Sequence, residues 1–244
     1  MTTATTIPPR SPSARTTFPQ DGKKHLLLAA SGSVATIKLP NIIGALAAHV
    51  PPSALAIRVI VTQSAQRFLA GQSPEQPPLQ ALRDSHPGVV EAIYTDASEW
   101  ATPWTRGADV LHIELRRWAD LLVIAPLSAN TLAKMVHGLA DNLLTSVVRA
   151  WDTTARIDGR RKHILVAPAM NTAMWLHPVT ARQLRVLQDE WGAWVEVLPP
   201  QESKSLVCGD TGAGAMMEWS EIVRRIEERL GLTVPEGDAS GAKP

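Results

Sequence analysis

Short apolar runs separated by helical segments dominate the middle of the chain. Five of these runs are apolar on both faces, and they cover residues 25–30, 56–61, 120–125, 163–167 and 193–197. Strands with two apolar faces are typical of a parallel sheet that is buried between helices. Right-handed crossover connections would place those helices on both sides of the sheet. The pattern therefore predicts an α/β protein with a three-layer Rossmann-like fold and a mostly parallel central sheet.

The two ends of the chain differ from this middle part in composition. Residues 1–22 are rich in Thr, Pro, Ser and Arg with almost no large apolar residues, and residues 233–244 are similar. Such segments cannot bury enough apolar surface to fold, so both are predicted to be disordered tails. Residues 23–232 would then form one domain. Within it, the proline-rich stretch 71–90 and the stretch 153–161 are predicted to be loops, not linkers between two cores.

Charge and cysteine content narrow the classes of partner. The 244 residues carry a formal net charge of +1 without a long run of one sign, which argues against nucleic acid or a membrane surface as a partner. No apolar stretch reaches the roughly 18 residues of a membrane span. One cysteine and the lack of an apolar secretory-signal segment favour a reducing compartment, the cytoplasm or also the nucleus. An organellar transit peptide is the alternative, because Arg10 and Arg15 lie in an acid-poor stretch.

Hydroxyl-bearing turns follow three of the predicted strands. Residues 31–33 (Ser-Gly-Ser), 62–64 and 128–131 each lie where a strand turns into a helix. Because the carboxyl ends of parallel strands meet at one edge, these turns are expected to form a nucleotide crevice with backbone N–H groups facing a phosphate. The alternative is three ordinary helix N-caps, since Ser and Thr are preferred there. The chain has no GxGxxG and no GxxxxGK[ST] motif, which argues against a standard dinucleotide or P-loop site.

The only cysteine, Cys208, lies in the glycine-rich segment 204–216. Gly209, Gly212 and Gly214 predict a flexible flap that can close over a substrate and let the thiol exchange a proton. The alternative is a free thiol on a surface loop.

His112 is a second candidate for proton transfer, because imidazole titrates near neutral pH. It lies just before the third predicted strand, but six other histidines compete with it, and the residue pattern alone does not choose among them. No grouping of His, Cys and Asp shows zinc-ligand spacing, so no metal site is predicted.

Residues 168–175, Pro-Ala-Met-Asn-Thr-Ala-Met-Trp, match the PxMNxxMW motif of the flavin-containing cysteine decarboxylases. Further matching stretches occur in order between residues 24 and 229, at 32–35, 112–120, 125–132, 141–144 and 208–216. The chain therefore resembles the phosphopantothenoylcysteine decarboxylase family, whose relatives include fungal and plant halotolerance proteins. The resemblance implies a flavoprotein fold and the FMN-dependent decarboxylation of 4'-phosphopantothenoylcysteine to 4'-phosphopantetheine in coenzyme A biosynthesis.

The resemblance also implies a role for each matching residue. FMN would be held by the three turns and the start of the PxMNxxMW motif, that is by Gly32, Ser33, Val34, Thr62, Gln63, Ser64, Ser128, Ala129, Asn130, Thr131 and Ala169. The substrate would be lined by Asn171, Ser205, Val207 and Met216, with Asn171 on its carboxylate. His112 would act as acid or base during oxidation and decarboxylation. Cys208 would then protonate the remaining ene-thiolate while the reduced flavin returns its hydride.

Three alternatives remain beside this interpretation. Family members are typically trimers with the flavin between subunits, so a homotrimer is expected, and a heterotrimer with paralogues is the alternative. A sister decarboxylase for peptide C-terminal cysteines is another, although such enzymes lack the reductive cysteine that Cys208 matches. The third is a regulatory subunit that inhibits a protein phosphatase. The presence of His112 and Cys208 argues against this alternative, and so does the lack of a long acidic C-terminal tail. The stretches 71–90 and 153–161 also look longer than in compact family members.

Overall fold

Six strands form one parallel sheet in the order β3-β2-β1-β4-β5-β6. The computed structural model describes residues 20–201, 204–205 and 211–232. The strands are β1 Lys24–Ala30, β2 Leu55–Val61, β3 Val90–Thr95, β4 Leu121–Leu127, β5 His163–Pro168 and β6 Val195–Val197. This order confirms the predicted Rossmann-like α/β fold, and the sheet is parallel throughout.

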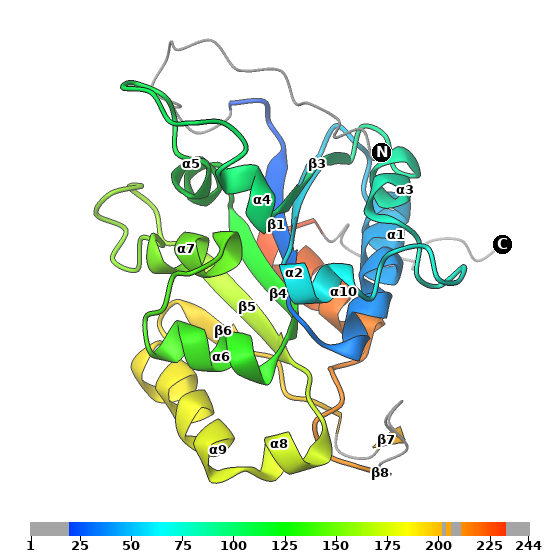
Figure 1. Ribbon diagram of the computed structural model, residues 1–244. Coiled ribbons are helices and arrows are strands. Elements are labelled where there is room, and N and C mark those ends of the chain that lie inside the picture. The colour runs from blue at the N-terminus through cyan, green and yellow to red at the C-terminus, as the bar shows by residue number, and fades with distance from the viewer. Residues whose placement is uncertain (1–19, 202–203, 206–210, 233–244) are drawn as a thin grey trace, which may run out of the picture.

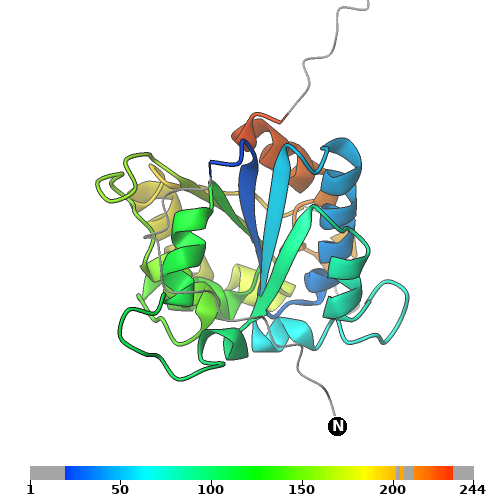
Figure 2. The same ribbon diagram turned by 90° about the horizontal axis from the view of Figure 1, so that it is seen from above.

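Helices cover both faces of the sheet, which gives the three layers seen from above in Figure 2. One face carries a 3₁₀ turn η1 (Val34–Lys38), α1 (Leu39–His49), α3 (Leu79–Asp84) and α10 (Trp219–Leu230). The other face carries α5 (Leu111–Trp118), α6 (Ala129–Val136), α7 (Leu143–Arg149), α9 (Pro178–Arg185) and the π-helical turn η2 (Val186–Glu190). Figure 1 shows these two groups on either side of the strands.

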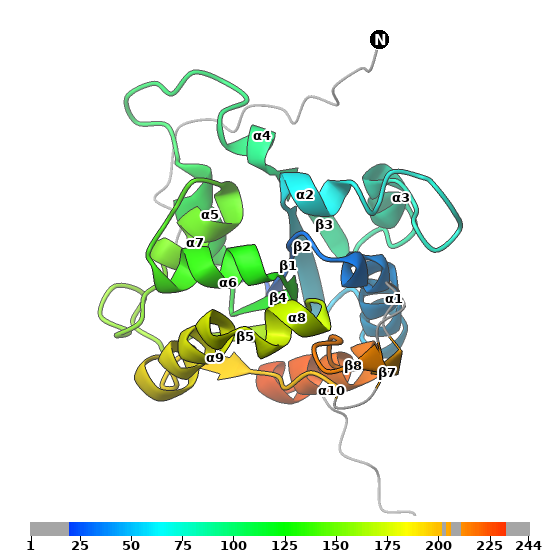
Figure 3. The same cartoon turned by 60° about the horizontal axis from the view of Figure 1, so that its bottom comes forward.

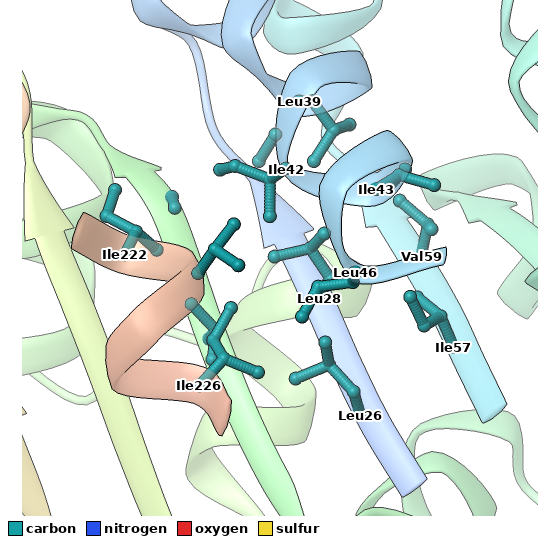
Figure 4. Close-up of a cluster of buried hydrophobic side chains, with 14 of the residues drawn as sticks. Leu26, Leu28, Leu39, Ile42, Ile43, Leu46, Ile57, Val59, Ile222 and Ile226 are labelled. Atoms are coloured by element: carbon teal, nitrogen blue, oxygen red, sulfur yellow. The ribbon is translucent and has the colours of Figure 1, made fainter. Parts of the chain in front are cut away.

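The alternation of side chains along β1 divides the core into two clusters. Leu26 and Leu28 face α1 and α10, whereas Leu27 and Ala29 face α5 to α7. In the first cluster, which Figure 4 shows, Ile222 and Ile226 lie one turn apart on α10 and pack toward β1. All of these side chains are fully buried, so both faces of the sheet are covered by apolar contacts.

Three details of the fold differ from the sequence-based expectation. The sequence predicts a loop over residues 71–90, but residues 79–84 form α3. It predicts no strand at the position of the edge strand β3, because Val90 is the one buried residue of this strand and the rest is half-buried. The third predicted strand continues through Pro126 to Leu127, where its pairing with β5 shifts register.

Short elements gather at the carboxyl edge of the sheet, which comes forward in Figure 3. They are α2 (Gln63–Gln66), α4 (Asp96–Glu99), α8 (Thr172–Leu176) and a two-stranded hairpin of β7 (Lys204–Ser205) and β8 (Thr211–Gly212). The chain order reverses between β1 and β4, and ligands of open α/β sheets bind outside the strand ends at such a point. The fold therefore locates the candidate site at this edge.

Candidate active site

The three hydroxyl-bearing turns meet at the switch point of the sheet. Ser31, fully buried, donates a hydrogen bond through Oγ to the carbonyl of Pro126 (3.0 Å) and accepts one from the backbone N–H of Ser128 (2.8 Å). This pair of bonds ties the turn after β1 to the turn after β4. Gly32 packs just as closely on the turn after β2, since a Cβ at this position would lie 2.6 Å from the Cβ of Ser64. A side chain at residue 32 would therefore push the first two turns apart.

Each turn is also an ordinary helix N-cap. The side-chain oxygens of Ser33, Thr62 and Ser128 accept hydrogen bonds from backbone N–H groups two or three residues later, at 3.4, 3.4 and 3.3 Å. The N-cap alternative is thus correct for all three as a local description. It does not compete with anion binding, because other N–H groups of a first helical turn can still bind a ligand, although at α2 the N–H of Gln63 donates to Asp96 (3.0 Å).

A cavity of about 480 Å³ lies beside the first of these turns. Five residues predicted to bind cofactor or substrate line it: Ser33, Val34, Ala169, Asn171 and Met216. Its size is in the range of small-molecule sites. The predicted cofactor residues of the other two turns, 62–64 and 128–131, and Gly32 are not among its lining residues. The structure therefore brings one predicted turn together with two of the four predicted substrate residues, Asn171 and Met216, and the other two turns lie outside the cavity lining.

Polar residues that the sequence did not single out also line this cavity, among them Lys38, Glu75 and Gln201. Lys38 ends η1, five residues after Ser33. Glu75 comes from the 71–78 loop and Gln201 from the segment after β6. Only their position in the fold identifies them, because none lies in a motif.

Asn171 enters this cavity from the turn after β5. Its Oδ1 accepts a hydrogen bond from the backbone N–H of Met174 at 2.9 Å, which makes Asn171 the N-cap of α8. This bond fixes the orientation of the amide, so Nδ2 is the end that can donate to a ligand. The turn itself is fixed to the end of β4, because the N–H of Ala169 donates to the carbonyl of Leu127 at 2.9 Å.

The glycine-rich segment 204–216 begins in β7 and continues past β8 to residues that contact this turn. Gly214 has φ +108°, and its carbonyl accepts a hydrogen bond from the N–H of Met170 at 3.0 Å. A Cβ at Gly214 would lie 2.6 Å from the carbonyl oxygen of Met170, so only glycine fits here. Of the residues predicted for this segment, Met216 is buried and lines the cavity, and the backbone of Ser205 lies in β7. Val207 and Cys208 lie outside the described residues.

His112 lies on α5, on the face of the sheet opposite to α1 and α10. Its Nδ1 is 2.9 Å from Oε1 of Glu99, whose side chain is 5% exposed, and the imidazole is 25% exposed. His112 does not line the cavity that contains Asn171. In Figures 1 and 3, α5 and α8 are well separated. One copy of the chain therefore does not bring His112 and Asn171 together.

Two further observations concern metal ligands and membrane spans. Among the residues that the structure places, no group of three or more His, Cys, Asp or Glu side chains could hold a metal ion. No helix in this part of the chain has the length and apolar character needed to cross a membrane.

Comparisons with known proteins assign this arrangement to a family. The flavoprotein family matches residues 15–231. Phosphopantothenoylcysteine decarboxylase of Mus musculus is 43% identical over 223 residues, which cover 91% of this chain and 95% of the mouse protein. Coenzyme A biosynthesis protein 3 of Saccharomyces cerevisiae is 40% identical over 223 residues, and the chain spans only 36% of its length.

Two solved structures share the fold at similar identity. A PPC decarboxylase mutant complexed with pantothenoylaminoethenethiol is 46% identical, with a TM-score of 0.68 and coverage of 84% of this chain and 97% of that one. The FMN binding protein AtHal3 is 43% identical, with a TM-score of 0.67 and coverage of 87% and 99%.

Proposed function

The chain belongs to the flavoprotein family, and from this premise we propose that it is an FMN-dependent phosphopantothenoylcysteine decarboxylase of coenzyme A biosynthesis. The observation that carries the proposal is the cavity of about 480 Å³, where residues from the turns after β1 and β5 and the segment after β8 meet. Relatives at 43 and 46% identity carry this activity in their names. A chain with one thiol fits the reducing cytoplasm, where we place the enzyme.

The residues at the switch point fit a flavin mononucleotide. Backbone N–H groups at the starts of η1 and α6, together with that of Ser64 in α2, would hold a single phosphate, and the close fit of Gly32 against Ser64 keeps the first two turns together. Ala169, 3% exposed, presents only a methyl group toward the cavity, which leaves room for a flat ring. When bound, FMN supplies reversible two-electron redox chemistry.

Three side chains of this chain would handle the substrate. The Nδ2 amide of Asn171 donates to the substrate carboxylate, and as a neutral group it orients the anion without a full counter-charge that would oppose loss of carbon dioxide. Lys38, on the same cavity wall as Ser33, supplies a positive charge for the substrate phosphate. The thiol of Cys208 protonates the carbon that decarboxylation leaves electron-rich.

His112 would complete the site from a second copy of the chain. This follows from its place on the opposite face of the sheet from the cavity, and it supports an oligomer in which each site lies between two subunits. The number of subunits that we propose, three, is the one that the family resemblance implies. Met174 and Leu176 on α8, 54% and 71% exposed, supply apolar surface next to Asn171 for such a contact.

The first expected result concerns the cofactor and the product. The purified protein should be yellow, and denaturation should release FMN and not FAD, because the turns suit a monophosphate and the dinucleotide fingerprint is missing. Incubation with 4'-phosphopantothenoylcysteine should yield 4'-phosphopantetheine and carbon dioxide in equal amounts, measured by mass spectrometry. Release of FAD, or a folded protein that yields neither flavin nor product, would contradict the proposal.

The second expected result concerns Cys208→Ser. A thiol, whose pKa is about 8.5 in short peptides, is replaced by a hydroxyl that hardly ionises, so the final protonation should fail while the earlier steps proceed. One equivalent of carbon dioxide per site should appear, the visible flavin band should stay bleached under anaerobic conditions, and an ene-thiol should accumulate. Wild-type protein under the same conditions should recover the band as phosphopantetheine forms. If the serine variant produced phosphopantetheine at the wild-type rate, Cys208 would have no part in the chemistry.

A further inference from the structure

His112 has a partner of its own that no motif indicates. Its Nδ1 lies 2.9 Å from Oε1 of Glu99, and the Glu99 side chain is 5% exposed. A carboxylate accepts hydrogen bonds and donates none, so the hydrogen of this contact belongs to Nδ1 of the imidazole. The other nitrogen, Nε2, then carries the lone pair and is the only ring atom that can take a proton.

The helix that carries Glu99 is attached to two neighbouring elements. Glu99 ends α4, and Asp96 begins this four-residue helix. The carboxylate of Asp96 accepts hydrogen bonds from the N–H of Gln63 (3.0 Å) and the N–H of Leu143 (3.3 Å). Helix α4 is thereby attached to the predicted flavin turn after β2 and to the start of α7, so Glu99 has a defined position relative to both.

The second oxygen of Glu99 is left without a partner in the described part of the chain. Oε2 is buried and accepts no hydrogen bond from the residues that the structure describes. A buried acceptor without a partner lowers the stability of a fold. Asp96, three residues earlier, has both of its carboxylate oxygens hydrogen-bonded to backbone N–H groups. Glu99 instead uses its other oxygen, Oε1, to hold the imidazole.

We propose that Glu99 is a positioning residue for His112, which fixes the imidazole with its hydrogen on Nδ1 so that Nε2 exchanges protons with the substrate. A proton taken from the substrate thiol resides on Nε2, and the Nδ1–H···Glu99 bond persists in the imidazolium without transfer of a proton to Glu99. The inference rests on the proposed function, because it assigns His112 the acid–base role.

The test replaces Glu99 by Gln, which has the same shape but can also donate to Nδ1 and so allows the wrong tautomer. Glu99→Gln should lower kcat about 100-fold and leave KM within about twofold, because the group acts on the proton-transferring residue and not on binding. Flavin content and thermal stability should stay near those of the wild type. The matched control is Glu91→Gln on β3, whose partner is Arg58 at 2.9 Å, and it should keep wild-type kcat.

A second measurement does not depend on activity. Nitrogen-15 NMR of histidine-labelled protein reads the tautomer of each ring, and His112 is assigned by the signal that His112→Asn removes. Wild-type protein should show the hydrogen on Nδ1 of His112. In Glu99→Gln the fraction of rings with the hydrogen on Nε2 should rise. The inference would be overturned if Glu99→Gln left the tautomer or kcat unchanged. It would also be overturned if kcat fell only as far as flavin or folded protein was lost. If His112→Asn itself stayed active, the proposed role of His112 would fail, while the tautomer measurement would still decide whether Glu99 orients the ring.

Discussion

Replacing His112 by Asn should abolish carbon dioxide release while the protein stays folded and yellow. An amide cannot accept and return a proton, and general acid–base catalysis contributes factors of about 100 to 10,000, so we expect a loss of about 1000-fold or more. The imidazole is 25% exposed and its side-chain hydrogen bond goes to Glu99, so little packing depends on it. The measurement is single-turnover release of carbon dioxide, with flavin absorbance and the oligomer's size determined on the same sample.

Mixing two inactive variants tests whether this loss has the cause that we assign to it. If each site takes His112 from one subunit and Asn171 from the next, random trimers of His112→Asn and Asn171→Asp chains should regain about a quarter of wild-type activity. In an equal mixture about half of the sites receive an intact His112, and about half of those also receive an intact Asn171. No recovery in mixed trimers would mean that both residues come from one chain. Full activity of His112→Asn alone would assign the proton transfer to another group.

The central strands can be predicted because both of their faces are buried. Leu26, Leu27 and Leu28 are all fully buried, so β1 is a continuous apolar run that needs no alternation to be recognised. The edge strand β3 gives no such signal, because its outer side faces solvent and residues 91–95 are half-buried. The sequence of β3 therefore has no continuous apolar run, because such a run is required only where a strand is buried on both faces.

The site residues that directly follow a strand can be predicted from the sequence. Those that reach the site only through contacts between different elements cannot. Ser33, Thr62 and Ser128 follow apolar runs, so strand order alone places them at one edge. Asn171 is found through its resemblance to a family motif. Glu99 and Lys38 lie in no motif, and only folding brings Glu99 to His112 across 13 residues of chain. Nor can the sequence show that His112 and the cavity lie on opposite faces of the sheet.

The stretch 153–161 is predicted as a loop, and the structure shows that it anchors α5. Its Asp158, 7% exposed, pairs through Oδ1 with Arg116 of α5 (2.7 Å) and through Oδ2 with Lys162 (2.7 Å). Burial lowers the pKa of Lys162, and the Asp158 carboxylate acts against this shift. Arg116 lies one helical turn after His112, so the stretch also fixes the helix that carries the proposed acid–base residue.

The start of this stretch is organised by Asp152. Burial acts to raise the pKa of Asp152, but hydrogen bonds from the backbone N–H groups of Asp158, Ile157 and Thr154 outweigh it and lower the pKa to about 2. These bonds, 2.7, 2.8 and 3.2 Å long, turn the backbone so that Asp158 points inward between Arg116 and Lys162. The buried charges therefore form one connected group, in which Asp158 is the acid between the two cations.

Replacing Asp158 by Asn should lower the stability of the protein by about 3 to 5 kcal/mol, because it removes the carboxylate that two buried cations share. For a chain of this size we expect a fall in Tm of about 10 °C, measured by differential scanning calorimetry.

The matched control is Asp141→Asn, which removes a carboxylate that is 59% exposed and pairs with Lys134 at the surface. It should change stability by less than about 1 kcal/mol. Adding Lys162→Met to Asp158→Asn should recover part of the loss, since one of the two buried cations is then absent. An Asp158→Asn protein as stable as the control would show that solvent reaches Arg116 and Lys162, and the anchoring role of residues 153–161 would be wrong.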